Sequence, residues 1–335
     1  MMNRYEPSGS GVQLPPLWEH LAHPRTRAVM SIQNAVLAAT RDLLGAEGFI
    51  ELLPPVMGPV TDPGIRGSKQ IDVDYYGHRY RLMTSAILYK QAALLNHERV
   101  FFVAPNIRLE PLETASTQRH LCEFHQLDVE MAGATRQDAM AMAEKIVLNA
   151  IRRVLDTAAT QLGKVGRNTA ALADAAAKPF TSVTHAEAVK LLHNAGCPQD
   201  GAAELSWKGE ALLSAIVGTP FFVTDYPKGS RGFYDRESTE VPGLLRNFDL
   251  IAGEGYGELA SGSEREADYA RIVLRMRETG ENPAKYAWYL GMMKQGVPAS
   301  AGFGIGLERL VRYIAGLDST WEASAFPKLP GIVSP

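Results

Sequence analysis

Residues 100–133, VFFVAPNIRLEPLETASTQRHLCEFHQLDVEMAG, decide the fold of this chain. They begin with a run of β-branched and aromatic residues, 100–104, which is typical of a buried strand. Proline and hydroxyl residues at 111–117 then indicate a loop. From Leu121 onward, apolar residues recur and predict a return strand. The stretch therefore predicts a long antiparallel hairpin.

Charged side chains gather near the expected tip of this hairpin. They are Arg108, Glu110, Arg119, His120 and Glu123. Cations, carboxylates and the neighbouring ring of Phe124 could together hold a polyphosphate, a metal ion and a purine. The alternative is a solvated loop that carries charges of both signs.

A second segment, residues 300–314 (SAGFGIGLERLVRYI), predicts a glycine-rich strand that runs into an amphipathic helix. Arg309 falls in the first turns of this helix. An arginine at this place can meet the terminal phosphate of a nucleotide, helped by the positive end of the helix. Taken alone, the glycine pattern is common and carries little weight.

The two segments together resemble motifs 2 and 3 of class II aminoacyl-tRNA synthetases, in particular the aspartyl and asparaginyl group. Motif 2 is matched by RLE at 108–110, RHLCEF at 119–124 and DVE at 128–130. Motif 3 is matched by GFGIGLER at 302–309. The resemblance implies an α+β fold, an antiparallel sheet flanked by helices. Residues 23–335 are expected to form the catalytic domain.

Composition agrees with a globular chain. Of the 335 residues, 46% are hydrophobic and 21% are charged, and the net charge of −3 implies no strongly basic surface. The two cysteines form no C-x-x-C pair, so neither a zinc site nor a disulfide framework is expected. No apolar run approaches the roughly 18 residues of a membrane span, and the N-terminus lacks a signal core, so a cytoplasmic location is expected. Residues 1–22 are expected to be a flexible arm.

Residues 24–55 resemble motif 1 of the same family. Apolar residues recur at helical spacing over 24–44, and GFIELLPP at 48–55 follows as a strand that ends at proline. In the family this motif forms the interface of a homodimer, so a homodimer is expected. The alternative is an ordinary helix and strand.

The segment SAILYKQ at 85–91 predicts the start of a helix with Ser85 as its N-cap. It resembles a segment of aspartyl-tRNA synthetases in which a lysine pairs with the side-chain carboxylate of the substrate. Lys90 stands at that place and favours a dicarboxylic substrate. The alternative is a surface lysine on a helix.

Residues 253–265, GEGYGELASGSER, resemble another segment of the family. The resemblance assigns Asp249, Glu258 and Ser261 to Mg²⁺ that bridges the phosphates of ATP, and Arg265 to the side-chain carboxylate of the substrate. Oxygen ligands suit Mg²⁺. The alternative for Glu258 and Arg265 is an ion pair at the edge of a strand.

The resemblance also implies roles around the nucleotide and the substrate. Arg108 would neutralise the α-phosphate, and Arg309, Arg119 and His120 would hold the distal phosphates. The remaining nucleotide contacts would be Phe124 (under the adenine), Glu110 and Gly306, and the remaining substrate contacts Ser85, Gln126 and Ser300.

Two positions depart from the synthetase pattern. Ile87 replaces a glutamine that holds the α-amino group, and Ser300 replaces a histidine. Either a changed orientation of the substrate or a different acid would explain both.

The chain begins about twenty residues before the motif 1 helix, so no anticodon-binding barrel is expected and tRNA is expected to be an unlikely partner. Several pieces resemble the archaeal-type asparagine synthetases. That resemblance implies an ATP-dependent ligase that adenylates the β-carboxylate of aspartate, or of a close analogue, and transfers the acyl group to ammonia, giving asparagine or a related amide, AMP and pyrophosphate. The alternatives are a paralogue that passes an acyl group to tRNA, a carrier or a small amine, and a nucleotide-sensing protein without activity.

Overall fold

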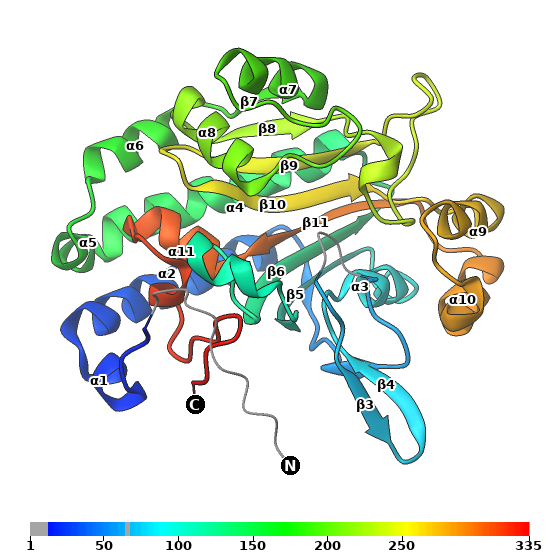
Figure 1. Ribbon diagram of the computed structural model, residues 1–335, viewed down its shortest axis with the longest axis horizontal. Helices are drawn as coiled ribbons and strands as arrows, with labels where there is room; N and C mark the ends of the chain where they lie inside the picture. Colours follow the sequence, from blue (N-terminus) through cyan, green and yellow to red (C-terminus); the bar gives the residue numbers. More distant parts are fainter. Residues whose placement is uncertain (1–12, 64–67, 335) are drawn as a thin grey trace.

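The computed structural model describes residues 13–63 and 68–334 and is built on one eight-stranded sheet (Figure 1). Its strand order is β1-β5-β6-β11-β10-β9-β8-β7, antiparallel throughout except for the parallel edge pairs β1–β5 and β7–β8. A separate three-stranded sheet has the order β2-β4-β3. The strands are β1 (Ile50–Glu51), β2 (Met57–Gly58), β3 (Asp72–Tyr75), β4 (His78–Leu82), β5 (Arg99–Ile107), β6 (Glu123–Ala132), β7 (Thr181–Thr184), β8 (Phe221–Thr224), β9 (Asn247–Ala252), β10 (Gly257–Glu264) and β11 (Ser300–Gly306).

Helices lie on both faces of the large sheet. The α-helices are α1 (Leu17–Ala22), α2 (Pro24–Ala46), α3 (Ile87–Ala93), α4 (Arg136–Thr157), α5 (Ala159–Val165), α6 (Thr169–Ala177), α7 (His185–Asn194), α8 (Trp207–Val217), α9 (Tyr269–Glu278), α10 (Ala287–Gln295) and α11 (Leu307–Ala315). Short 3₁₀ helices are η1 (Leu112–Thr117), η2 (Lys228–Ser230), η3 (Pro283–Tyr286) and η4 (Thr320–Ala323). No helix in the described ranges is both long and apolar enough to cross a membrane.

The expected hairpin is the centre of the sheet and is confirmed. β5 and β6 pair antiparallel from Arg99 opposite Met131 to Ile107 opposite Glu123. β11 then pairs antiparallel with the other edge of β6. The α+β class with a helix-flanked antiparallel sheet is likewise confirmed.

Alternation along β6 gives the sheet two different faces. Leu127 and Val129 join the main hydrophobic core, together with residues of α2, α4 and α11. Because successive side chains of a strand point to opposite faces, Gln126, Asp128 and Glu130 lie on the other face. α2, α4 and α11 thus bury one side of the sheet. On the other side α7 and α8 cover β8 and β9 and α3 packs near β5, and polar groups occupy the space between them.

The N-terminal arm needs a correction. Residues 1–12 lie outside the described part of the chain, but residues 17–22 form α1. Its His20 is 5% exposed and its Nε2 donates to the carbonyl oxygen of Ser324 at 2.9 Å. The end of the expected flexible arm is therefore a helix fixed to the C-terminal segment.

The motif 1 region forms the long helix α2 and the short strand β1. His23 caps α2 by accepting the backbone N–H of Arg25, and Pro24 occupies the first helical position. β1 pairs parallel with β5, and apolar side chains beyond it are exposed, with Leu53 at 94%. The homodimer through this region stays a prediction.

The close packing of β11 on β6 depends on glycine. A Cβ on Gly302 would overlap the carbonyl oxygen of Val129 and the carboxylate of Glu130. We expect Gly302→Ala to lower the free energy of unfolding by about 1–3 kcal/mol, as overpacking does. Urea unfolding followed by circular dichroism measures this.

Gly163→Ala is the matched control. Gly163 lies in α5 and a Cβ there meets no atom within 4 Å, so this change should raise stability by about 0.5–1 kcal/mol. Equal free energies of unfolding for the two variants would mean that the backbone at Gly302 shifts to accommodate a Cβ without a loss of stability.

Candidate active site

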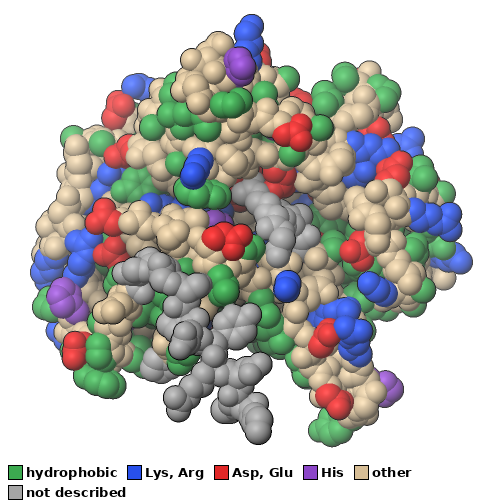
Figure 2. Space-filling model, in the orientation of Figure 1, with side chains coloured by type: hydrophobic (Ala, Val, Ile, Leu, Met, Phe, Trp, Pro, Cys, Tyr) green, Lys and Arg blue, Asp and Glu red, His purple; other side chains and the backbone are tan. Residues whose placement is uncertain are grey.

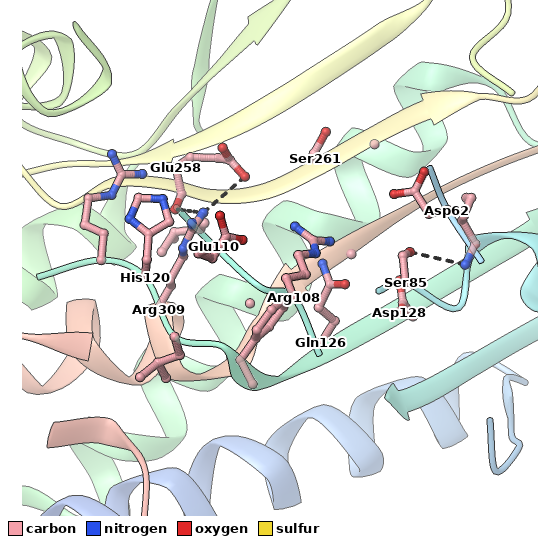
Figure 3. A pocket seen from close by; sticks show the side chains of 18 of the residues that line it. Asp62, Ser85, Arg108, Glu110, His120, Gln126, Asp128, Glu258, Ser261 and Arg309 are labelled. Atoms are coloured by element: carbon pink, nitrogen blue, oxygen red, sulfur yellow. Dashed lines mark hydrogen bonds and ion pairs between the residues drawn. The ribbon is translucent and has the colours of Figure 1, made fainter. Parts of the chain in front are cut away.

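A cavity of about 360 Å³ lies on the polar face of the sheet. β6, β10 and β11 form its floor, and α3, α11 and the loops before β6 and β9 form its walls. Figure 3 shows Arg108 and Gln126 entering it from the β5–β6 hairpin and Glu258 and Ser261 from β10.

On the face of the molecule in Figure 2, acidic and basic side chains are interspersed, and basic ones gather over α9 and α10.

The two motif arginines line this same cavity. Arg108 follows β5, and its Nε donates to the carbonyl oxygen of Thr84 at 2.9 Å. Its guanidinium lies over the ring of Phe124, with 5.1 Å between Cζ and the ring centroid. Arg309 lies in the first turn of α11, and its Nη1 is 3.3 Å from Glu258 Oε1. This end of the cavity also holds Glu110, His120 and Gly306.

Arg119 lines the cavity but is engaged by the protein. It is 4% exposed, and its Nη2 is 2.7 Å from Oε2 of the fully buried Glu210. Its Nη1 donates to the carbonyl oxygen of Trp207 at 3.1 Å. The guanidinium also packs on Gly257, where a Cβ would be 2.7 Å from its Cζ. Arg119 thus joins the loop before β6 to α8 and to the start of β10.

His120, next in the chain, also lines the cavity. Its Nδ1 is 2.6 Å from the hydroxyl oxygen of Thr117. This contact orients the imidazole from within the same loop.

Lys90 is buried rather than on the surface of α3. It is 2% exposed, and its Nζ donates to Asp128 Oδ1 at 3.0 Å and to the carbonyl oxygen of Phe303 at 2.9 Å. Glu130 Oε2 lies 3.6 Å away. The ammonium is therefore neutralised within the chain.

Arg265 is likewise paired within the chain, with Glu130. Its Nε donates to Glu130 Oε1 at 3.0 Å and its Nη2 to Glu130 Oε2 at 3.1 Å. Asp235 Oδ1 lies 3.6 Å from its Nη1. Burial raises the pKa of Asp235 against the opposing effect of Arg265.

The remaining residues expected at the substrate divide into two groups. Gln126 and Ser85 line the cavity. Gln126 accepts from Asn106 Nδ2 at 2.8 Å, and Ser85 accepts the backbone N–H of Ile87 at 3.3 Å, although α3 begins at Ile87 with Ala86 as its N-cap. Ser300 does not line the cavity; it is buried and donates to Glu130 Oε1 at 2.9 Å.

The three residues expected to bind metal are close together but differ in access. Glu258 and Ser261 line the cavity, whereas Asp249 is fully buried opposite Ser261 on β9. Burial raises the pKa of Asp249 to about 6, although the guanidinium of Arg231 opposes this. Arg231 Nη2 is 2.5 Å from Asp249 Oδ2. No cluster of three metal-ligating side chains occurs in the described ranges, but the Glu258 carboxylate in the cavity wall fits a Mg²⁺ that keeps several waters.

Sequence reasoning gave no site role to five residues that the structure brings to the cavity or its supports: Asp128, Glu130, Glu210, Arg231 and Asp235. Asp128 and Glu130 belong to the DVE of motif 2, where their alternation with Val129 was the available signal. The partner of Glu210, Arg119, is 91 positions away, and Asp249, the partner of Arg231, is 18 positions away. No local pattern in the sequence indicates either pair.

The family model described as tRNA synthetases class II (D, K and N) matches residues 13–330. The asparagine–tRNA ligase of Thermococcus kodakarensis is 33% identical over 316 residues, which are 94% of this chain and 72% of that protein. That of Lactococcus lactis is 33% identical over 326 residues. The structure of asparaginyl-tRNA synthetase from Pyrococcus horikoshii complexed with asparaginyl-adenylate superposes with a TM-score of 0.89 at 31% identity, over 95% of this chain and 72% of that one.

These relatives overturn one expectation. We expected tRNA to be an unlikely partner, but the curated relatives that match nearly all of this chain are tRNA ligases. That expectation is wrong, because it rested on where the chain begins and not on the residues of the cavity.

Glu308, which lines the cavity, forms a titratable pair with His125. His125 Nδ1 is 2.9 Å from Oε1 of the buried Glu308, whose carboxylate raises the pKa of His125 above the ordinary 6.5. A raised pKa means that this pair stabilises the fold fully below pH 6.5, and that its contribution is lost as the pH rises through the raised value. We expect NMR titration to place the His125 pKa above 6.5, and Glu308→Gln to remove the increase.

His125→Gln gives the matching stability test. The difference in unfolding free energy between this variant and the unmodified chain should be largest below pH 6.5 and should shrink at higher pH. A difference that is independent of pH would contradict the ion pair.

Proposed function

Because the chain belongs to the class II tRNA synthetases (D, K and N), which adenylate amino acids with ATP and Mg²⁺, we propose that it activates asparagine or a close amide analogue and passes the aminoacyl group to tRNA. In this proposal residues 23–335 form the catalytic domain. Adenylation of an amino acid by an AMP-forming ligase is common to the family as a whole.

The charge balance at the substrate end of the cavity carries the proposal. Two cations, Lys90 and Arg265, face three carboxylates, those of Asp128, Glu130 and Asp235. The formal sum of +2 and −3 is −1. A second carboxylate on the substrate would therefore enter a buried region without excess positive charge, which is costly.

An amide side chain suits the same groups. Its carbonyl oxygen can accept from Arg265 or Lys90, and its NH₂ can donate to a carboxylate. It adds no net charge to the buried set. The α-ammonium group would be bound by oxygens at the cavity wall, where Gln126 and Ser85 are among the candidates, since the side chain of Ile87 has no hydrogen-bonding group.

The nucleotide would occupy the other end of the cavity. Arg108 would neutralise the α-phosphate as the carboxylate of the amino acid attacks phosphorus and pyrophosphate leaves. Adenine would stack on Phe124, and Arg309 with His120 would hold the distal phosphates. Mg²⁺ on Glu258 would offset charge on the leaving group. Arg119 would support this loop through Glu210.

A second candidate is the ammonia-dependent ligase that acts on aspartate. The observation in its favour is Lys90, a cation in the cavity wall that the α-carboxylate of aspartate could use if Asp128 released it. The β-carboxylate would then be adenylated and attacked by ammonia.

ATP–pyrophosphate exchange separates the two candidates. We expect exchange with asparagine to exceed exchange with aspartate by at least about tenfold, the effect of a buried charge that is left unpaired. Aminoacyl-tRNA should form when tRNA is added. Mass spectrometry that finds asparagine made from aspartate and ammonium, with no exchange on asparagine, would favour the ligase instead.

Arg108→Ala tests the adenylation step. Loss of a cation that acts on the α-phosphate should slow single-turnover adenylate formation by about 10²–10³-fold. Arg153→Ala is the control, because Arg153 lies on α4 and its side chain is 39% exposed in a pair with Asp42. Unchanged adenylation in Arg108→Ala would remove Arg108 from the mechanism.

A further inference from the structure

Arg231 occupies the place between two of the residues expected to bind Mg²⁺. Its Nη2 is 2.5 Å from Asp249 Oδ2, and its Nη1 donates to Ser261 Oγ at 2.9 Å. Asp249 and Ser261 are directly opposite each other on β9 and β10. One guanidinium therefore already bonds both oxygen groups.

Further contacts fix this guanidinium. Its Nε is 2.9 Å from Glu204 Oε1, and its Cζ lies 4.2 Å from the ring centroid of Tyr226. Arg231 is only 7% exposed, and Tyr226 and Asp249 are fully buried. Withdrawal of the guanidinium would leave the carboxylate of Asp249 buried without its cation, which proteins rarely tolerate.

The loop that carries Arg231 is held in turn from α9. Arg275 is 4% exposed, and its Nη2 donates to the carbonyl oxygens of Lys228 at 3.0 Å and Gly232 at 3.4 Å. Those two carbonyls flank Arg231 in the chain. The position of the guanidinium is thus set by backbone as well as side-chain contacts.

Glu258, the third residue expected to bind Mg²⁺, differs from Asp249 because its carboxylate is accessible from the cavity. Glu258 lines the cavity, and its side chain is 15% exposed. Arg231 also lines the cavity, whereas Asp249 is not among its lining residues in the described ranges. A divalent ion that enters with the nucleotide would meet the Glu258 carboxylate and, on the way to Asp249, a permanent positive charge.

We propose that Arg231 is the resident cation of the Asp249–Ser261 pair, so that the divalent ion of the reaction is held from the cavity side by Glu258, without Asp249 or Ser261 as ligands. Arg231 is then a positioning residue that balances the buried carboxylate and gives the phosphate end of the cavity a fixed positive charge. This inference rests on the use of ATP and Mg²⁺ and is independent of the amino acid and of the acceptor.

Metal binding without turnover tests it. Mn²⁺ is titrated into the full chain saturated with α,β-methylene-ATP, and free Mn²⁺ is followed by electron paramagnetic resonance. Glu258→Gln should weaken binding by at least about tenfold, while Asp249→Asn and Ser261→Ala should stay within about twofold of the unmodified chain. Asparagine keeps an oxygen that can accept from Arg231, and thermal unfolding shows whether each variant is folded.

Two results would overturn the inference. One is weakening by Asp249→Asn or Ser261→Ala as large as that by Glu258→Gln. The other is an affinity for Mn²⁺ that Glu258→Gln leaves unchanged. If Asp249→Asn does not fold, Ser261→Ala decides alone, since it removes one ligand from any ion held between the two strands. Because no amino acid or tRNA is present, either result leaves the proposed aminoacylation untouched.

Discussion

Two buried cations and three buried carboxylates, bonded to one another across four segments of the chain, constrain the rest of this structure. Lys90 comes from α3, Arg265 from the end of β10, Asp128 and Glu130 from β6, and Asp235 from the loop before β9. Removal of one partner from this set would leave a buried charge without its counter-ion. The four segments must therefore be in place together. The apolar face of the sheet can be packed in many ways, but the polar face allows one arrangement.

Glycine makes that arrangement possible. The strand that follows β6 in the sheet, β11, presents Gly302 and Gly304 where any side chain would meet Glu130, Asp128 or Gln126. The same absence of side chains leaves the floor of the cavity open to a ligand. Glycines that look like a phosphate-binding pattern in the sequence therefore also provide space for neighbouring acids.

Local patterns predicted the scaffold well. The hairpin and the strand-to-helix junction before Arg309 follow from short-range periodicity. The convergence of Arg108 with Arg309 on one cavity followed from the resemblance of the two motifs to a known family. Long-range charge pairs could not be predicted from local patterns. Nothing near Lys90 in the sequence indicates that it pairs with Asp128, which is 38 positions later. The sequence predicts that Lys90 binds a carboxylate of the substrate and that Arg119 binds phosphate. In the structure Lys90 is paired with Asp128 and Arg119 with Glu210. The same gap explains why α1 was expected to be flexible, since His20 is fixed by a residue 304 positions away.

The register of β5 against β6 has a consequence for how this chain can vary. Loss or gain of a single residue between Phe124 and Glu130 would turn Leu127 and Val129 toward the cavity and push Asp128 and Glu130 into the helices. Length changes in the 3₁₀ turn at Leu112–Thr117, outside the paired strands, would shift neither face. Insertions and deletions that survive in descendants of this chain should therefore accumulate in that turn and be absent from β6.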